Sequence, residues 1–108
     1  MKPKDHKIIE AILSGKDQKV VAELYDSCFR KIRDYVRKNA GNQEDAQDVF
    51  QDAIIIFYKH VRAGKFDYSF DIDGFLFTVC RNIWINKAKK AGRETELKDG
   101  FENISETN

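Results

Sequence analysis

Residues 42–62, NQEDAQDVFQDAIIIFYKHVR, carry the clearest structural signal in this chain. Asn42 is a good N-cap, and the acids Glu44 and Asp45 follow in the first turn, where the helix dipole favours negative charge. Beyond them apolar residues recur every three or four positions, which is the period of a helix with one buried face. The run at 54–58 is β-prone in isolation, but it lies inside this longer period. The stretch therefore predicts a helix over 42–62.

The same period recurs on both sides of this stretch and predicts three more helices. A short one is expected over roughly 5–14, with Asp5 as its cap, and a long one over about 17–39. The last should begin near Asp71 or Asp73 and end near residue 91. No strand pattern competes, so the fold is predicted to be all-α, a compact bundle of three long helices plus a short N-terminal helix. The predicted core consists of Leu24, Cys28, Ile32, Val36, Val49, Phe50, Ala53, Phe57, Leu76, Val79 and Ile83.

Length and composition limit the class of protein. The chain has 108 residues, enough for one domain. Its hydrophobic share of 42% is too high for a disordered chain, and its charged share of 34% is too high for a membrane-spanning one. Cys28 and Cys80 lie inside apolar helical patterns, which favours reduced thiols and a cytoplasmic location. We expect residues 1–93 to form the domain and the polar, acidic segment 94–108 to begin an interdomain linker.

Charge is segregated into blocks, although the net charge is only +1. Residues 81–93 hold five basic residues and no acid. Residues 42–56 hold four acids and no base, and 94–108 hold five acids against one lysine. Blocks of opposite sign predict two partners with opposite electrostatic preferences.

The polar face of the 42–62 helix has an apolar centre. On a helical wheel Asp48, Gln51 and Asp52 lie together with Ile55. A charged face is usually only solvated, and a single exposed isoleucine can be accidental. An apolar centre with an acidic rim is also typical of a protein-binding patch. Both interpretations stay open from the residues alone.

The last predicted helix combines cations, amides and aromatic rings. Thr78, Arg81 and Asn82 lie away from its predicted core stripe, and Phe77 and Trp84 lie on its flank. Cations suit phosphates and planar rings suit bases, so this surface favours single-stranded nucleic acid. The alternative is that both rings pack against neighbouring helices. The preceding loop, 65–73, adds Phe66, Tyr68 and Phe70.

Signals for catalysis are weak. His6 and His60 have no nearby partner in sequence, and the chain contains no CxxC, HExxH, P-loop or GxSxG motif. Asp45, Asp48 and Asp52 form a carboxylate cluster without the histidine that accompanies such clusters in metal-binding bundles. We therefore expect no enzyme, no catalytic residue, no cofactor and no metal site.

Two stretches resemble the bacterial sigma-70 family of RNA polymerase sigma factors, in its extracytoplasmic-function (ECF) group. Residues 44–53, EDAQDVFQDA, are similar to region 2.2, which typically shows Asp-Ala-Glu-Asp and then Gln-Glu. Residues 75–82, FLFTVCRN, are similar to the region 2.3–2.4 pattern Trp-Leu-Tyr-x-Ile-Ala-Arg-Asn, with Phe75 for the usual tryptophan. The likeness spans about 18–93. The second, helix-turn-helix domain of these factors has no counterpart here, so we expect either a domain of a longer factor or a lone region 2 module.

The resemblance implies a promoter-recognition domain that binds core RNA polymerase and melts the −10 promoter element. Docking on the coiled coil of the β′ subunit is implied for Asp45, Asp48, Gln51, Asp52 and Ile55. Binding of the non-template DNA strand is implied for Phe66, Tyr68, Phe70, Thr78, Arg81, Asn82, Lys87, Lys89, Lys90 and Arg93. An anti-sigma factor is a further partner known in the family. Two alternatives stay open: a helical DNA-binding module independent of polymerase, and a helical protein-interaction adaptor.

Overall fold

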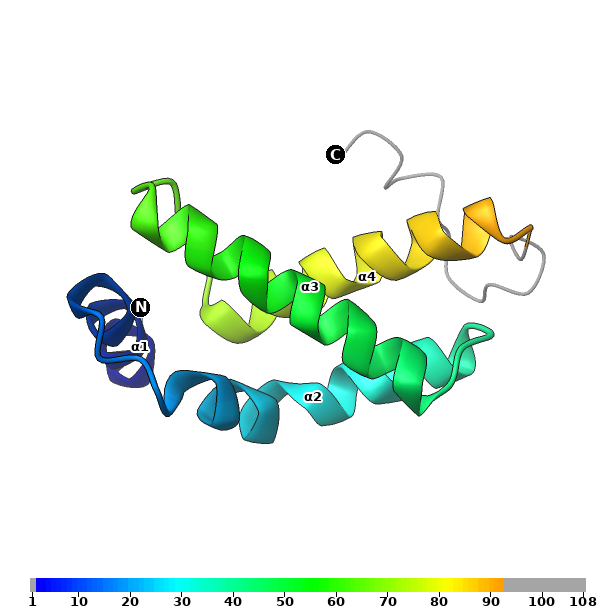
Figure 1. Ribbon diagram of the computed structural model, residues 1–108, viewed down its shortest axis with the longest axis horizontal. Coiled ribbons are helices and arrows are strands. Elements are labelled where there is room, and N and C mark those ends of the chain that lie inside the picture. Colours follow the sequence, from blue (N-terminus) through cyan, green and yellow to red (C-terminus); the bar gives the residue numbers. More distant parts are fainter. Residues whose placement is uncertain (1, 93–108) are drawn as a thin grey trace.

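The computed structural model describes residues 2–92, which form four helices (Figure 1). The helices are α1 (Pro3–Ser14), α2 (Val20–Lys38), α3 (Gln43–Arg62) and α4 (Ile72–Lys90). No strand occurs among the described residues, so the all-α prediction, with three long helices after a short one, is confirmed. The expected linker 94–108 and the predicted DNA contact Arg93 lie outside the described residues.

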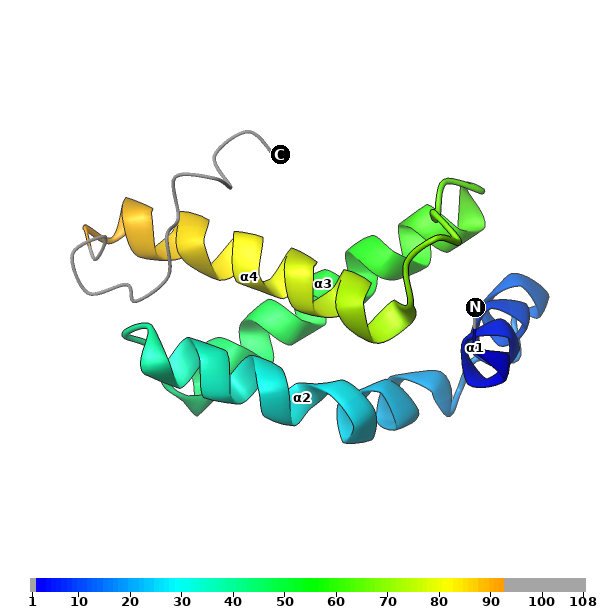
Figure 2. The ribbon, with the colours of Figure 1, turned by 180° about the vertical axis from the view of Figure 1, so that it is seen from behind.

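The helices α2, α3 and α4 enclose one hydrophobic core (Figures 1 and 2). α2 and α4 run in the same direction, and α3 crosses them in the opposite one. α1 packs against α2 and α3, at the end where α2 begins and α3 finishes. The loop from α3 into α4 lies at this same end, so α1 is close to the start of α4.

Nine of the eleven predicted core residues are buried, and the two exceptions, Val79 and Ile83, are partly buried. Val79 and Ile83 are less buried than predicted because Trp84 occupies the core. Trp84 is 3% exposed, and its Nε1 donates a hydrogen bond to the Asn39 carbonyl oxygen at 2.8 Å. α4 turns this side inward, which leaves Val79 and Ile83 at its edge beside α3. Phe77 and Trp84 were the two rings that could either bind nucleic acid or pack against neighbouring helices. Trp84 packs in the core.

Gly41 permits this close approach between the turn after α2 and the indole. A Cβ atom at position 41 would lie 2.8 Å from the Trp84 ring, which is closer than Cβ atoms approach other atoms in proteins. The turn is tight, because Ala40 has a positive φ of 76°. A side chain at position 41 would collide with both Val36 and Trp84, so the turn or the core beside it would have to shift.

The start of α3 is as predicted, whereas the start of α1 is not. Asn42 Oδ1 accepts from the Asp45 N–H, and Asp45 Oδ2 accepts from the Asn42 N–H, both at 2.9 Å. This reciprocal pair is a capping box. The prediction that Asp5 caps its own helix is wrong. α1 begins at Pro3, whose fixed φ suits a first helical position, and Asp5 is buried within the helix.

Candidate functional site

The outer face of α3 carries four of the residues predicted to bind polymerase. The capping box fixes where α3 begins, and the helical period then brings Asp48, Gln51, Asp52 and Ile55 to one side. All four are exposed. The exposed fraction of Ile55 is 53%, so the predicted exposure of this face is confirmed.

Ile55 is not an isolated apolar side chain, because an open groove runs between α2 and α3 beside it. Val21 and Tyr25 of α2 border the same groove, with exposed fractions of 46% and 39%. Tyr25 is oriented by stacking on the Phe29 ring, with the ring centroids 4.4 Å apart. Neither of these α2 residues was among the side chains predicted to bind polymerase. We call this surface the α2–α3 groove; it is lined by Val21, Tyr25, Gln47, Phe50, Gln51, Ile54 and Ile55.

Two of the predicted docking acids already have partners within the domain. Asp45 is half-buried and its carboxylate serves the capping box, so the structure gives it a role in starting α3. Asp52 Oδ2 lies 3.5 Å from Lys87 Nζ of α4, and both side chains are about half exposed. An exposed pair of this kind contributes only ~0–1 kcal/mol, so Asp52 remains available to another partner.

The aromatic side chains between α3 and α4 fall into two groups. Phe66 is 5% exposed and packs against Phe57 and Phe75, with ring centroids 5.5 Å and 5.3 Å away. This burial contradicts the prediction that Phe66 offers its ring to DNA; the ring is part of the core. Tyr68 and Phe70 are exposed, at 55% and 57%. The loop therefore presents two rings to solvent rather than three.

A turn at Asp67 shapes the loop between these rings. Asp67 Oδ1 accepts hydrogen bonds from the Ser69 hydroxyl at 2.7 Å and from the Ser69 N–H at 2.9 Å. These two bonds, the hydroxyl first, hold the pKa of Asp67 below its ordinary value. The loop is thus ordered by its own side chains, with Phe66 anchored in the core before the turn.

α4 carries the predicted base-reading residues on its outer sides. Thr78 is exposed, while Arg81 and Asn82 are half-buried. Within the described part of the chain, Arg81 Nε and Asn82 Oδ1 are buried atoms without a hydrogen-bond partner. Leaving such an atom unpaired costs ~1–3 kcal/mol. Both side chains therefore have a hydrogen-bonding capacity that the domain leaves unused.

Asn82 also lines an open groove between α3 and α4. Asn86 contributes a second amide to this groove, and Phe75, which replaces the usual tryptophan, contributes a ring. His60 of α3 is held there by a hydrogen bond from Nδ1 to the Ile56 carbonyl oxygen at 3.0 Å. Amides beside aromatic and apolar walls are the features that suit an unstacked base.

The basic end of α4 is less free than its sequence indicates. Lys87 is paired with Asp52, and Lys89 is half-buried, whereas Lys90 is exposed. Of these three lysines, only Lys89 is partly withdrawn from solvent, because the exposed Lys87–Asp52 pair is as weak for Lys87 as it is for Asp52.

α2 supplies cations that the sequence analysis missed. Residues 30–38 contain five basic residues against the single acid Asp34, and four of the five are exposed. This part of α2 packs beside α4, whose outer residues are predicted to bind DNA, because Tyr35 lies edge-on against Phe77 with ring centroids 5.6 Å apart. A charge count along 30–38 would have found it. The four exposed cations are Arg30, Lys31, Arg37 and Lys38.

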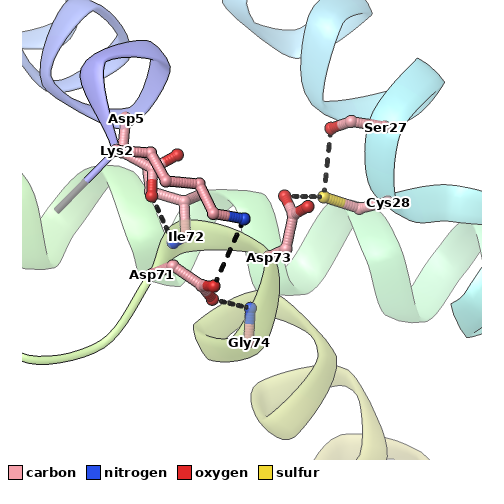
Figure 3. Close-up of polar contacts among 8 residues, drawn as sticks. All are labelled: Lys2, Asp5, Ser27, Cys28, Asp71, Ile72, Asp73 and Gly74. Carbon is pink, nitrogen blue, oxygen red and sulfur yellow. Dashed lines mark hydrogen bonds and ion pairs between the residues drawn. The ribbon is translucent and has the colours of Figure 1, made fainter.

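The first turn of α4 is held from outside as well as from within (Figure 3). Asp71 is its N-cap, and Asp71 Oδ1 accepts from the Gly74 N–H at 2.7 Å. From α2, Cys28 Sγ donates to Asp73 Oδ1 at 2.9 Å. Burial and then this bond raise the pKa of Cys28 to about 12, so the thiol keeps its proton at neutral pH. The loop therefore enters α4 at a fixed point.

These features define a class of protein: a small all-α domain with an apolar groove on one helix pair and a cationic, amide-bearing helix preceded by exposed rings. The family model for sigma-70 region 2 matches residues 24–94, from within α2 to beyond α4. The chain belongs to this family, whose members are promoter-recognising transcription initiation factors and not enzymes. Comparisons with curated proteins and with solved structures find no significant match.

Three further features concern residues 2–92. None of the four helices there combines the length and apolar character needed to cross a bilayer. No group of three or more His, Cys, Asp or Glu side chains in this part of the chain could hold a metal ion. Cys28 and Cys80 are both free and buried.

Proposed function

We propose that this domain is the promoter-recognition module of an ECF-type sigma factor. It docks on core RNA polymerase through the α2–α3 groove and binds the non-template strand of the −10 element with α4 and the loop before it. The two surfaces use different residues, and they meet where Asp52, predicted to dock, lies 3.5 Å from Lys87, predicted to bind DNA.

The observation that carries the proposal is the α2–α3 groove. Val21, Tyr25 and Ile55 are 39% to 53% exposed around one depression, and a cluster of exposed apolar side chains of this kind is typical of a protein-binding surface. A helix laid in the groove would cover all three. Asp48 and Asp52 are exposed on the same outer face of α3 as Ile55, and they favour basic residues on that partner helix. The coiled coil of the β′ subunit is the partner of this kind that the family uses.

DNA recognition would divide between rings and α4. Tyr68 and Phe70 are the exposed rings on which unpaired bases stack. Unpairing costs a few kcal/mol per base, and stacking on a ring returns about 1–3 kcal/mol per base. Arg81 and Asn82 are half-buried on α4, and guanidinium and amide groups are the kind that read base edges. The domain thus traps the open state without hydrolysing anything, and polymerase supplies the rest of the binding energy.

The proposed role also fixes the cellular setting. A polymerase partner places the domain in the cytoplasm. An anti-sigma factor that covered the α2–α3 groove would block docking, and one that covered α4 would block promoter binding.

The test uses the full chain, purified bacterial core RNA polymerase and a fluorescent non-template −10 oligonucleotide. We expect the chain to bind the core enzyme, to bind the oligonucleotide weakly alone, and to bind it more tightly in the complex. No binding to core enzyme would contradict the proposal. If, in addition, Asp48→Lys and Asp52→Lys raised DNA affinity, the result would favour a DNA-binding module independent of polymerase.

A further inference from the structure

Asp5 is a buried charged residue that the proposed function does not use. It is 3% exposed, and its Oδ2 accepts a hydrogen bond at 3.2 Å from the N–H of Ile72, the first residue of α4 (Figure 3). N–H groups in the first turn of a helix have no partner within that helix, and the helix dipole favours negative charge there. Asp5 therefore caps α4 from α1, across 67 positions of sequence.

A second contact from α1 lies beside this bond. Lys2 Nζ is 3.6 Å from Asp71 Oδ2, with both side chains well exposed, so this ion pair is the weaker of the two (Figure 3). Asp71 and Ile72 are the N-cap and the first residue of α4. Asp5 of α1 and Lys2 just before α1 therefore contact the two residues at which the loop becomes a helix.

Residues predicted to bind DNA lie on both sides of these two contacts. Phe70, which is 57% exposed, immediately precedes Asp71. Arg81 and Asn82 follow on α4, so a shift of its first turn is passed along the rigid helix to them. The other end of the loop is anchored separately by buried Phe66. Loss of Asp5 would remove one of the contacts that hold the Phe70 end, next to the Cys28–Asp73 bond, and would leave the Phe66 end unchanged.

We infer that Asp5 is a positioning residue for promoter recognition: α1 holds the end of the loop and the first turn of α4 where Phe70, Arg81 and Asn82 meet the bases. The inference rests on the proposed function. It concerns a part of the chain outside the family match at 24–94. Asp5 lines no part of the α2–α3 groove, so its loss should leave polymerase docking unchanged.

The experiment compares three variants of the full chain with the wild type. Asp5→Ala removes the acceptor, and Asp5→Asn keeps an oxygen acceptor without its charge. Glu10→Ala is the matched control, because Glu10 is an exposed acid on the same helix. For each we measure affinity for core polymerase, affinity of the complex for matched and scrambled −10 DNA, and NMR amide exchange at Ile72 in the free domain.

For Asp5→Ala we expect a loss of up to about tenfold on matched DNA, the full contribution of one charge-assisted hydrogen bond, with little change on scrambled DNA. Affinity for core polymerase should stay at the wild-type value, and the Ile72 amide should exchange faster. Asp5→Asn should recover part of the matched-DNA affinity. Glu10→Ala should behave as the wild type throughout.

Equal losses on matched DNA, scrambled DNA and core polymerase would show a merely structural role and overturn the inference. Unchanged exchange at Ile72 would overturn it too. If Asp5→Ala does not fold, Asp5→Asn tests the inference instead. The positioning role is rejected if the Ile72 amide of Asp5→Asn exchanges faster while its preference for matched over scrambled DNA stays at the wild-type value. A wild-type complex without preference for matched DNA would instead refute the proposed function before any variant is compared.

Discussion

Truncation of Ile55 tests the α2–α3 groove without adding charge. Ile55→Ala removes three carbons from a side chain that is 53% exposed in the free domain. At ~0.8 kcal/mol per buried carbon, those atoms are worth ~2.4 kcal/mol when fully buried. About half of this is already gained on folding, so docking on polymerase gains the remaining ~1.2 kcal/mol. Affinity for core polymerase should therefore fall about eightfold.

Leu13→Ala provides the matched control. Leu13 is 57% exposed, loses the same number of carbons, and lies on α1 rather than in the groove. Both variants should lose about 1 kcal/mol of folding stability, because a similar half of each side chain is buried. Only Ile55→Ala should lose affinity for polymerase, and Ile55→Glu, which brings a charge into the groove, should lose more with the fold intact.

The assay pairs urea denaturation with titration of each variant against core polymerase. Equal polymerase affinities for Ile55→Ala and Leu13→Ala would refute docking through the groove. A loss of folding stability above about 3 kcal/mol for Ile55→Ala would show a buried side chain and remove the basis of the calculation.

Three further results are expected. Asn82→Ala should cost ~1–3 kcal/mol on the cognate −10 element and little on scrambled DNA, whereas Lys90→Ala should weaken both similarly, since phosphate contacts carry no sequence information; binding of both DNAs by the polymerase complex decides this. Arg37→Ala should make the log–log salt slope of single-stranded DNA binding less steep by about 0.7, and an unchanged slope would remove α2 from the DNA path. The pKa of Cys28 is raised from 9.0 to about 12, so the folded state holds the thiol proton more tightly than the unfolded chain. The contribution of this thiol to the free energy of unfolding should be fully present below pH 9 and should be lost as the pH rises toward 12. Urea denaturation across this range should therefore show a smaller loss of stability for Cys28→Ala than for the wild type.

The elements of this fold are visible in the sequence because each is encoded locally. Asn42 and Asp45 lie three residues apart, so the capping box and the direction of α3 follow from a short stretch. The exposure of Ile55 follows from the same stretch, since a wheel needs only the helix and its buried side. Local signals of this kind predict one face of one helix correctly.

Features that depend on two helices could not be predicted in this way. Val21 and Tyr25 share the apolar period of α2, and only the way α2 meets α3 leaves them in water. Phe66 looks like its neighbours in the loop until its packing against Phe57 is known. Asp5 has the sequence position of a cap, yet its partner lies 67 residues away. The groove and the link from α1 to α4 therefore required the structure.

Site-specific photo-crosslinking within the polymerase–promoter complex tests the central claim most directly. A photoreactive amino acid is placed at position 55 of the full chain, and the crosslinked product is identified after irradiation. The proposed orientation predicts a crosslink to the coiled coil of the β′ subunit and none to DNA, because Ile55 lies in the groove and not on α4. A crosslink from position 55 to the non-template strand, or to no part of the β′ subunit, would contradict it.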